Sequence, residues 1–218
     1  GLTSLTLPDS LTTIKSYAFS GCSGLTSLTL PESLTTIESF AFMDCTGLTS
    51  LTLPKFLTTI EGAAFYGCSS LTSVKLPENL SEIGERAFYG CSSLKKLEIP
   101  SGIESIGNSC LDGCKSLEEL VIPLSVTFID SKAFDGTGFL ENRKEEFVSV
   151  GGILMKYNGN EENLIIPDNI RAISACVFYE CNTLKSVKLP DGISEICAGT
   201  FYSCTNLETV IMPDSLIK

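Results

Sequence analysis

The stretch Gly24–Thr46, with the sequence GLTSLTLPESLTTIESFAFMDCT, recurs along the chain with a period of 23 residues. Apart from one interruption, all nine prolines occupy one phase of that period, and seven of the ten cysteines occupy another. A fixed period of this length predicts a solenoid, in which each repeat is one coil that packs only against its neighbours. The residues in phase are Pro8, Pro31, Pro54, Pro77, Pro100, Pro123, Pro167, Pro190 and Pro213, and Cys22, Cys45, Cys68, Cys91, Cys114, Cys181 and Cys204.

Each repeat combines a strand pattern with a turn pattern. Leu28-Thr29-Leu30 alternates apolar and polar residues, which predicts a short strand with one buried face. Pro31 has no amide hydrogen to donate to a strand ladder, so the strand should end there. Leu34 and Ile37, and then the residues around Phe42, recur at intervals of three or four, which predicts a bend followed by a helical or 3₁₀ turn.

The coils are expected to stack because a repeat of 23 residues cannot bury its own leucines. Equivalent leucines of adjacent coils would then lie about 4.8 Å apart, which is the spacing of paired strands. Strands aligned in this way form one parallel sheet along one side of the solenoid. The predicted fold class is therefore an α/β solenoid, with a short parallel strand in each coil and helical or 3₁₀ turns opposite.

The full pattern, L-x-x-L-x-L-P-x-x-L-x-x-I-x-x-x-A-F-x-x-C, resembles the BspA-like subclass of leucine-rich repeats over essentially the whole chain. Phe42 and Cys45 occupy the Phe and Cys positions of that pattern in the quoted repeat. The resemblance implies a right-handed superhelix in a protein that is secreted or exposed on the surface of mucosal anaerobes or protozoan parasites. It also implies adhesion, with host fibronectin, fibrinogen or the surfaces of other microbes as the partners.

The period breaks once, between Gly138 and Asn163. Two β-prone runs within the break, Phe147–Val150 and Ile153–Tyr157, flank Gly151-Gly152. This arrangement predicts a β-hairpin with a two-residue turn. The hairpin either bridges two blocks of repeats, which is the favoured interpretation, or decorates one rim of the solenoid and contacts a partner.

The expected organisation is a single domain over residues 1–218. It comprises a first block of coils at 1–138, the hairpin insertion at 139–163 and a second block at 164–218. Neither terminal coil has a polar cap, so we expect the chain to be a piece of a longer protein. It begins without a basic and apolar leader, so no export signal is expected within it.

Composition argues against several classes of function. The formal net charge of −11 disfavours binding to nucleic acid or to anionic membrane surfaces. His is absent, which removes the commonest general base and the commonest metal ligand. No apolar run approaches the roughly 18 residues of a membrane span. Polar residues recur as repeated surface positions rather than as a cluster, so we expect no enzymatic activity, no cofactor and no metal.

The cysteines allow three interpretations. Zinc is disfavoured because the closest pairs, such as Cys110 and Cys114, have no matching second pair. Disulfides along the ladder are disfavoured because parallel Cβ vectors do not face one another. The favoured interpretation is buried thiols that act as small hydrophobic side chains, with Cys110 also in the core. Cys176 and Cys197, in adjacent coils, are the one pair for which a disulfide stays open.

The outward strand positions are the candidate binding surface. In the first three coils they are almost uniformly Ser and Thr, which are ordinary residues of solvent-facing strands. Later coils replace them with charged and apolar residues, and a diversified surface is where a ligand would be recognised. The predicted ligand-binding residues are Lys75, Lys96, Glu98, Glu119, Val121, Ile165 and Lys188.

Tyrosines form a second stripe, because Tyr66, Tyr89, Tyr179 and Tyr202 each follow the repeat Phe. They are expected to pack on the convex side with their hydroxyls in water, although tyrosine is also favoured as an anchor at interfaces.

The leading functional hypothesis is an adhesin-type module, at the cell surface or secreted, that binds an extracellular protein or glycoconjugate. The alternatives are a passive spacer that projects another domain, and an intracellular protein-interaction module.

Overall fold

The backbone winds in stacked coils, and equivalent residues of adjacent coils pair in register, as Thr13 does with Thr36 and Thr36 with Thr59. A computed structural model describes residues 1–130, 132–214 and 216. The chain divides into two units, which are Gly1–Val126 with Lys132–Asn142, and Thr127–Ser131 with Arg143–Lys218.

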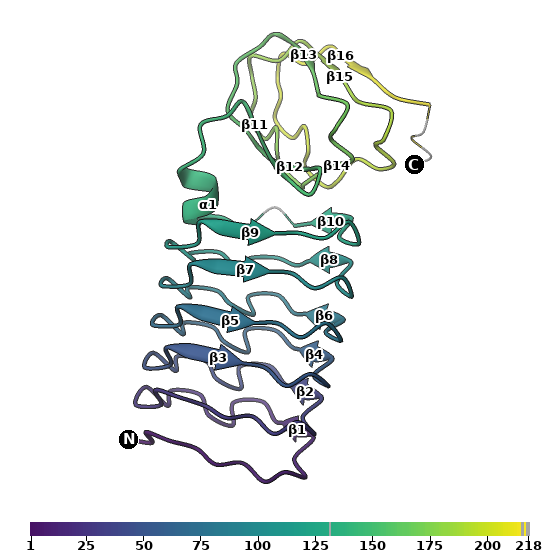
Figure 1. Cartoon of the computed structure of the whole chain (residues 1–218). Coiled ribbons are helices and arrows are strands. Elements are labelled where there is room, and N and C mark those ends of the chain that lie inside the picture. The colour runs from purple at the N-terminus through teal and green to yellow at the C-terminus, as the bar shows by residue number, and fades with distance from the viewer. Residues whose placement is uncertain (131, 215, 217–218) are drawn as a thin grey trace. The chain divides into compact units, whose positions relative to one another are not determined.

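The first unit carries a parallel sheet on the predicted strand face (Figure 1). Along each strand the middle residue is buried and its two neighbours are exposed, so the predicted alternation is confirmed. The residues Leu28–Leu30 are not in a strand, so the prediction of a strand in every coil is wrong. The strands are β3 (Ser50–Thr52), β5 (Ser73–Lys75), β7 (Lys96–Glu98) and β9 (Glu119–Val121).

A second parallel sheet runs along the same coils, where no strand was predicted. Ile37 pairs with Ile60 in it, and both side chains are fully buried. These two-residue strands repeat at one phase of the 23-residue period and pair in register from coil to coil. The strands are β1 (Thr13–Ile14), β2 (Thr36–Ile37), β4 (Thr59–Ile60) and β6 (Glu82–Ile83), and β8 (Ser105–Ile106) has the same phase.

The expected helical turns opposite the first sheet are not formed. Every second amide there donates to the next coil instead of along its own coil, as from Phe42 to Ala64 O at 2.8 Å and from Asp44 to Tyr66 O at 2.7 Å. Phe40 and Asp44 have φ of 61° and 55°, a left-handed conformation that a right-handed helix excludes. Among the described residues the one helix is α1 (Gly138–Glu141).

The core of the first unit consists of ladders of identical residues. The rings of Phe42, Phe65 and Phe88 stack with centroids 5.4 and 5.5 Å apart, and all three are fully buried. The Cys68 thiol donates a hydrogen bond to Phe42 O at 3.3 Å, and Cys91 does the same to Phe65 O. The predicted buried thiols are confirmed at Cys45, Cys68, Cys91, Cys110 and Cys114, whereas Cys22, Cys181 and Cys204 are only partly buried.

The second unit contains the predicted hairpin. Its strands pair antiparallel, with Val150 opposite Ile153. The hairpin also joins the coil ladder, because Leu154 pairs in parallel with Ile173. The strands of this unit are β10 (Phe128–Ile129), β11 (Phe147–Val150), β12 (Ile153–Tyr157), β13 (Asn163–Ile165), β14 (Ala172–Ile173), β15 (Ser186–Lys188) and β16 (Thr209–Ile211).

The hairpin is part of the core of this unit. Ile153, Leu154 and Tyr157 are buried, and the Tyr157 ring packs on Phe178. Of the two interpretations of the insertion, this burial supports the bridging element over the rim decoration.

Candidate functional site

The strand face of the first unit presents two rows of outward side chains. One row, at the last position of each strand, is Thr52, Lys75, Glu98 and Val121, and the other, at the first position, is Ser50, Ser73, Lys96 and Glu119. The in-register pairing of the strands fixes these rows, since Thr52 lies beside Lys75 and Glu98 beside Val121. Chemical variety is thereby concentrated on β5, β7 and β9.

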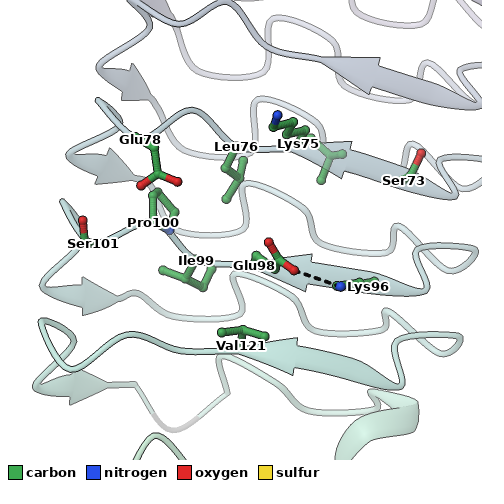
Figure 2. A pocket seen from close by; sticks show the side chains of 11 residues that line it. Ser73, Lys75, Leu76, Glu78, Lys96, Glu98, Ile99, Pro100, Ser101 and Val121 are labelled. Atoms are coloured by element: carbon green, nitrogen blue, oxygen red, sulfur yellow. Dashed lines mark ion pairs between the residues drawn. The ribbon is translucent and has the colours of Figure 1, made fainter.

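A hollow of about 370 Å³ lies on this part of the face (Figure 2). Its lining includes four of the predicted binding residues, which are Lys75, Lys96, Glu98 and Val121. Leu76 and Ile99, both buried, are also in the lining. The sequence pattern therefore identified four residues that the fold brings to one concave surface.

Lys96 is the electrostatic centre of the hollow. Its Nζ lies 2.9 Å from Glu98 Oε1 and 3.7 Å from Glu119 Oε2, and all three side chains are more than half exposed. The hydrogen bond with Lys96 holds the pKa of the Glu98 carboxyl below its ordinary value, and the same bond with Glu98 raises the pKa of Lys96. Both groups are therefore charged near neutral pH, and exposed pairs of this kind exchange readily with the charges of a ligand.

Lys75 carries a positive charge in the hollow and forms no ion pair with any described residue. Its ammonium contributes to the lowered pKa of Glu98. Lys75 and the Lys96 cluster together give the hollow charges of both signs beside the exposed apolar side chain of Val121. A mixed surface of this composition suits a protein ligand better than a small apolar molecule.

Sequence reasoning missed the rim that follows the strands. Glu78, Pro100 and Ser101 line the hollow, and Figure 2 shows them beyond the ends of β5 and β7. A signal for them existed, because the residue after each repeat Pro differs between coils and is most often acidic.

Two predicted residues lie in the other unit. Ile165 and Lys188 occupy the outward row of the sheet β13–β15–β16, where Ile165 pairs with Lys188 and Lys188 with Ile211. This row is more apolar, with Ile165 69% and Ile211 51% exposed. The prediction of a single sheet along the whole chain is therefore wrong: β3, β5, β7 and β9 form a four-stranded sheet in the first unit, and β13, β15 and β16 form a three-stranded sheet in the second.

The cysteines form neither a disulfide nor a metal site among the described residues. All ten are free thiols, including Cys176 and Cys197, for which a disulfide had stayed open. The thiol of Cys176 is directed to Ala198 O at 3.8 Å. Within residues 1–130, 132–214 and 216, no three Cys, Asp or Glu side chains gather in a geometry that could hold a metal ion.

The tyrosine stripe consists of stacked pairs. Tyr66 and Tyr89 have centroids 4.7 Å apart with an interplanar angle of 5°, and Tyr179 and Tyr202 are stacked at 5.5 Å. The rings therefore pack on one another, while Tyr179 and Tyr202 are 50% and 62% exposed. No helix in the described part of the chain has the length and apolar character of a membrane span.

A comparison with solved structures found a protein whose fold supports this architecture. A leucine-rich repeat protein from Bacteroides ovatus has 31% identity and a TM-score of 0.66, and the match covers 96% of this chain and 54% of that one. The chain thus spans about half the length of that protein. A leucine-rich cell surface protein from Faecalibacterium prausnitzii has 23% identity and a TM-score of 0.49, over 99% of this chain and 74% of that one. No curated protein sequence matches the chain.

A family model described as the BspA type leucine rich repeat region matches six times, over residues 1–61, 37–146 and 154–218. These matches include the coils that carry the strand-face hollow and leave out most of the hairpin. The resemblance seen in the sequence is therefore confirmed, and the chain belongs to the BspA-type leucine-rich repeat family.

Proposed function

We propose that this chain is an adhesin-type module, secreted or held at a cell surface, that binds an extracellular protein or glycoprotein through its strand face. The family supports a protein-interaction role in general terms. The observation that carries the proposal is the hollow on β5, β7 and β9, where the outward rows depart from Ser and Thr. A passive spacer would not need these charged and apolar residues, because Ser and Thr are sufficient for a strand that faces solvent.

Recognition would use a rigid surface with many modest contacts. The strands are fixed by in-register pairing between coils, so little conformational entropy is lost when a ligand binds. Lys75, Lys96, Glu98 and Glu119 would exchange ion pairs with the ligand, and Val121 would supply apolar contact. Ile165 and Lys188 would provide a second contact area on the other unit.

The experiment is binding of the chain to immobilised fibronectin, fibrinogen and mucin at physiological salt. The test variant is K75S/K96S/E98S, which removes three of the four charged side chains that line the hollow and keeps Glu78. The matched control is Lys115→Ser, an exposed turn residue, which makes the net charge one unit more negative, as the triple variant does. Saturable binding that is lost in the triple variant and kept in the control is the expected result.

Two outcomes would contradict the proposal. Binding that survives in the triple variant would exclude the hollow as the binding surface. No binding to any of the three ligands would favour the spacer, and the strand face would then have no ligand among the partners that the family implies.

A further inference from the structure

A second hollow lies on the first unit, among the turns that were expected to be helical. Its volume is about 420 Å³, and aromatic, basic and polar residues line it together. It is distinct from the strand-face hollow, since the two linings share no residue. The lining residues are Phe40, Tyr66, Arg86, Tyr89, Asn108, Ser109, Asp112 and Lys132.

The hollow is elongated along the axis of the coils. Phe40, Tyr66, Tyr89, Asp112 and Lys132 come from five successive repeats. With about 4.8 Å between coils, the lining extends over roughly 19 Å. A linear polymer lying along the coils fits such a groove better than a compact molecule.

The residues that line this hollow carry a net positive charge, whereas the whole chain is negatively charged. Arg86 and Lys132 are exposed, and neither forms an ion pair within the described residues. Asp112 is the one carboxylate in the lining, and it accepts a hydrogen bond from the Ser109 hydroxyl at 3.4 Å. A local excess of positive charge on a chain of net charge −11 favours an anionic ligand.

The backbone below the groove has little hydrogen-bonding capacity left for a peptide. The Phe40 amide donates to Gly62 O at 3.1 Å, the Arg86 amide to Asn108 O at 3.0 Å, and the Tyr89 amide to Arg86 O at 3.0 Å. A peptide could not pair with these amides as an added strand. Recognition would therefore use side chains, namely the hydroxyls and ring edges of the two stacked tyrosines, an amide and two cations.

We propose that this groove binds an acidic oligosaccharide. The carboxylate or sulfate groups of the sugar would bind Arg86 and Lys132, and its apolar ring faces and hydroxyls would contact Tyr66 and Tyr89. Guanidinium groups bind both kinds of anion, so carboxylated and sulfated chains share the same recognition chemistry. The site is independent of the protein ligand proposed for the strand face.

The test is calorimetric titration of the whole chain with three defined tetrasaccharides. These are tetragalacturonate, its fully methyl-esterified form and a chondroitin sulfate tetrasaccharide. We expect one or both acidic probes to bind and the neutral ester to bind at least about tenfold more weakly, because a charge-assisted hydrogen bond contributes about 1.5–3 kcal/mol. Affinity should also fall as salt is raised, since the charges are exposed.

The variants Arg86→Gln and Lys132→Gln should each weaken binding of the acidic probe by about tenfold. Lys115→Gln is the matched control, because it removes one positive charge from an exposed turn that lines neither hollow. Thermal unfolding of all three should match that of the wild type, since the replaced side chains are exposed. An equal loss in Lys115→Gln would show a nonspecific charge effect and would overturn the proposal.

A tetraglutamate peptide tests the alternative that the groove binds an acidic peptide. Binding of this peptide with an affinity equal to or above that of the acidic sugars would overturn the assignment to saccharide. Failure of every acidic probe to bind at low salt would overturn the site itself. Neither result depends on whether the strand face binds fibronectin, fibrinogen or mucin.

Discussion

The ring of Tyr157, from the hairpin, packs on the ring of Phe178, from the resumed repeat, with centroids 5.3 Å apart. Phe178 in turn stacks on Phe201 at 5.4 Å. Tyr157 therefore occupies the place that the Phe of a preceding coil holds elsewhere in the ladder. Its hydroxyl accepts a hydrogen bond from the Glu161 amide at 3.2 Å, which fixes the end of the hairpin. The insertion thus continues the core although it breaks the repeat.

The first prediction follows from this contact. Tyr157→Ala should lower the free energy of unfolding of the second unit by about 3 kcal/mol, because it leaves a cavity over Phe178. Tyr157→Phe, the control, keeps the ring and should cost about 1 kcal/mol for the lost hydrogen bond. Urea unfolding followed by circular dichroism measures both. Equal losses in the two variants would mean that the ring does not support the ladder.

The second prediction concerns the close approach of two coils at Gly84. A Cβ at this position would lie 2.8 Å from Gly62 Cα, whereas a Cβ at Gly62 would meet Glu85 O at 3.3 Å. Gly84→Ala should therefore lower the free energy of unfolding by about 2 kcal/mol, because the coils must separate locally. Gly62→Ala, on the same ladder, should be the milder change in the same urea unfolding experiment. The reverse order would contradict the coil spacing.

The third prediction concerns the buried thiols at alkaline pH. Burial raises the pKa of Cys45 to about 11 and of Cys110 to about 12, and it raises the pKa of Cys68 and of Cys91 well above the ordinary value of a thiol. Thiols with a folded pKa above the unfolded value of 9.0 contribute stability that is complete well below pH 9, where the unfolded thiols are protonated, and is lost as pH rises through 9 towards the folded pKa. Under reducing conditions, the free energy of unfolding should fall from about pH 8 to about pH 10.

The control for this prediction is the double variant C68A/C91A. It should be less stable than the wild type at pH 7, but its stability should fall less steeply between about pH 8 and pH 10, because two ionisable groups are gone. The measurement is urea unfolding at each pH. An identical slope in both proteins would show that these thiols do not cause the alkaline loss.

These elements also show how much of the structure could be predicted from the sequence. The strand face was predictable, because Leu51, Val74 and Leu97 alternate with polar residues at a period of two. The hairpin was predictable from Gly151-Gly152 between two β-prone runs. Both signals are local, because neighbouring residues alone determine the strand and the two-residue turn.

The turns were not predictable in the same way. Apolar spacing of three or four residues, as at Ala41, Phe42 and Cys45, is shared by a helix and by a turn whose amides bond to the next coil. The left-handed conformation of Phe40 excludes the helix and fits the turn, and this conformation becomes favourable only in the stack of coils. The second hollow was missed for the same reason, because its residues come together only in the observed turns.

The candidate site was predictable in part. The outward rows follow from the strand pattern, so Lys75, Lys96, Glu98 and Val121 could be named. The rim residues Glu78 and Ser101 come from the turn after the repeat Pro, and their approach to the strands depends on how that turn folds.

The fourth prediction is that the strand-face variant K75S/K96S/E98S folds as well as the wild type. The Lys96–Glu98 pair is more than half exposed, and exposed pairs contribute little to stability. Its urea unfolding midpoint should match that of the wild type. A clearly lower midpoint would mean that the strand-face charges support the fold, and loss of binding in this variant could then not be assigned to recognition.

The central claim, that the strand face binds the ligand, is tested most directly by a lysine acetylation footprint. The chain is acetylated with and without a saturating amount of fibronectin, fibrinogen or mucin, and the modification of each lysine is measured by mass spectrometry. Lys75 and Lys96 should be protected by the bound ligand, whereas Lys15 and Lys115, off the strand face, should be modified equally in both samples. Equal modification of Lys75 and Lys96 with and without bound ligand, or protection confined to Lys15 and Lys115, would contradict the account.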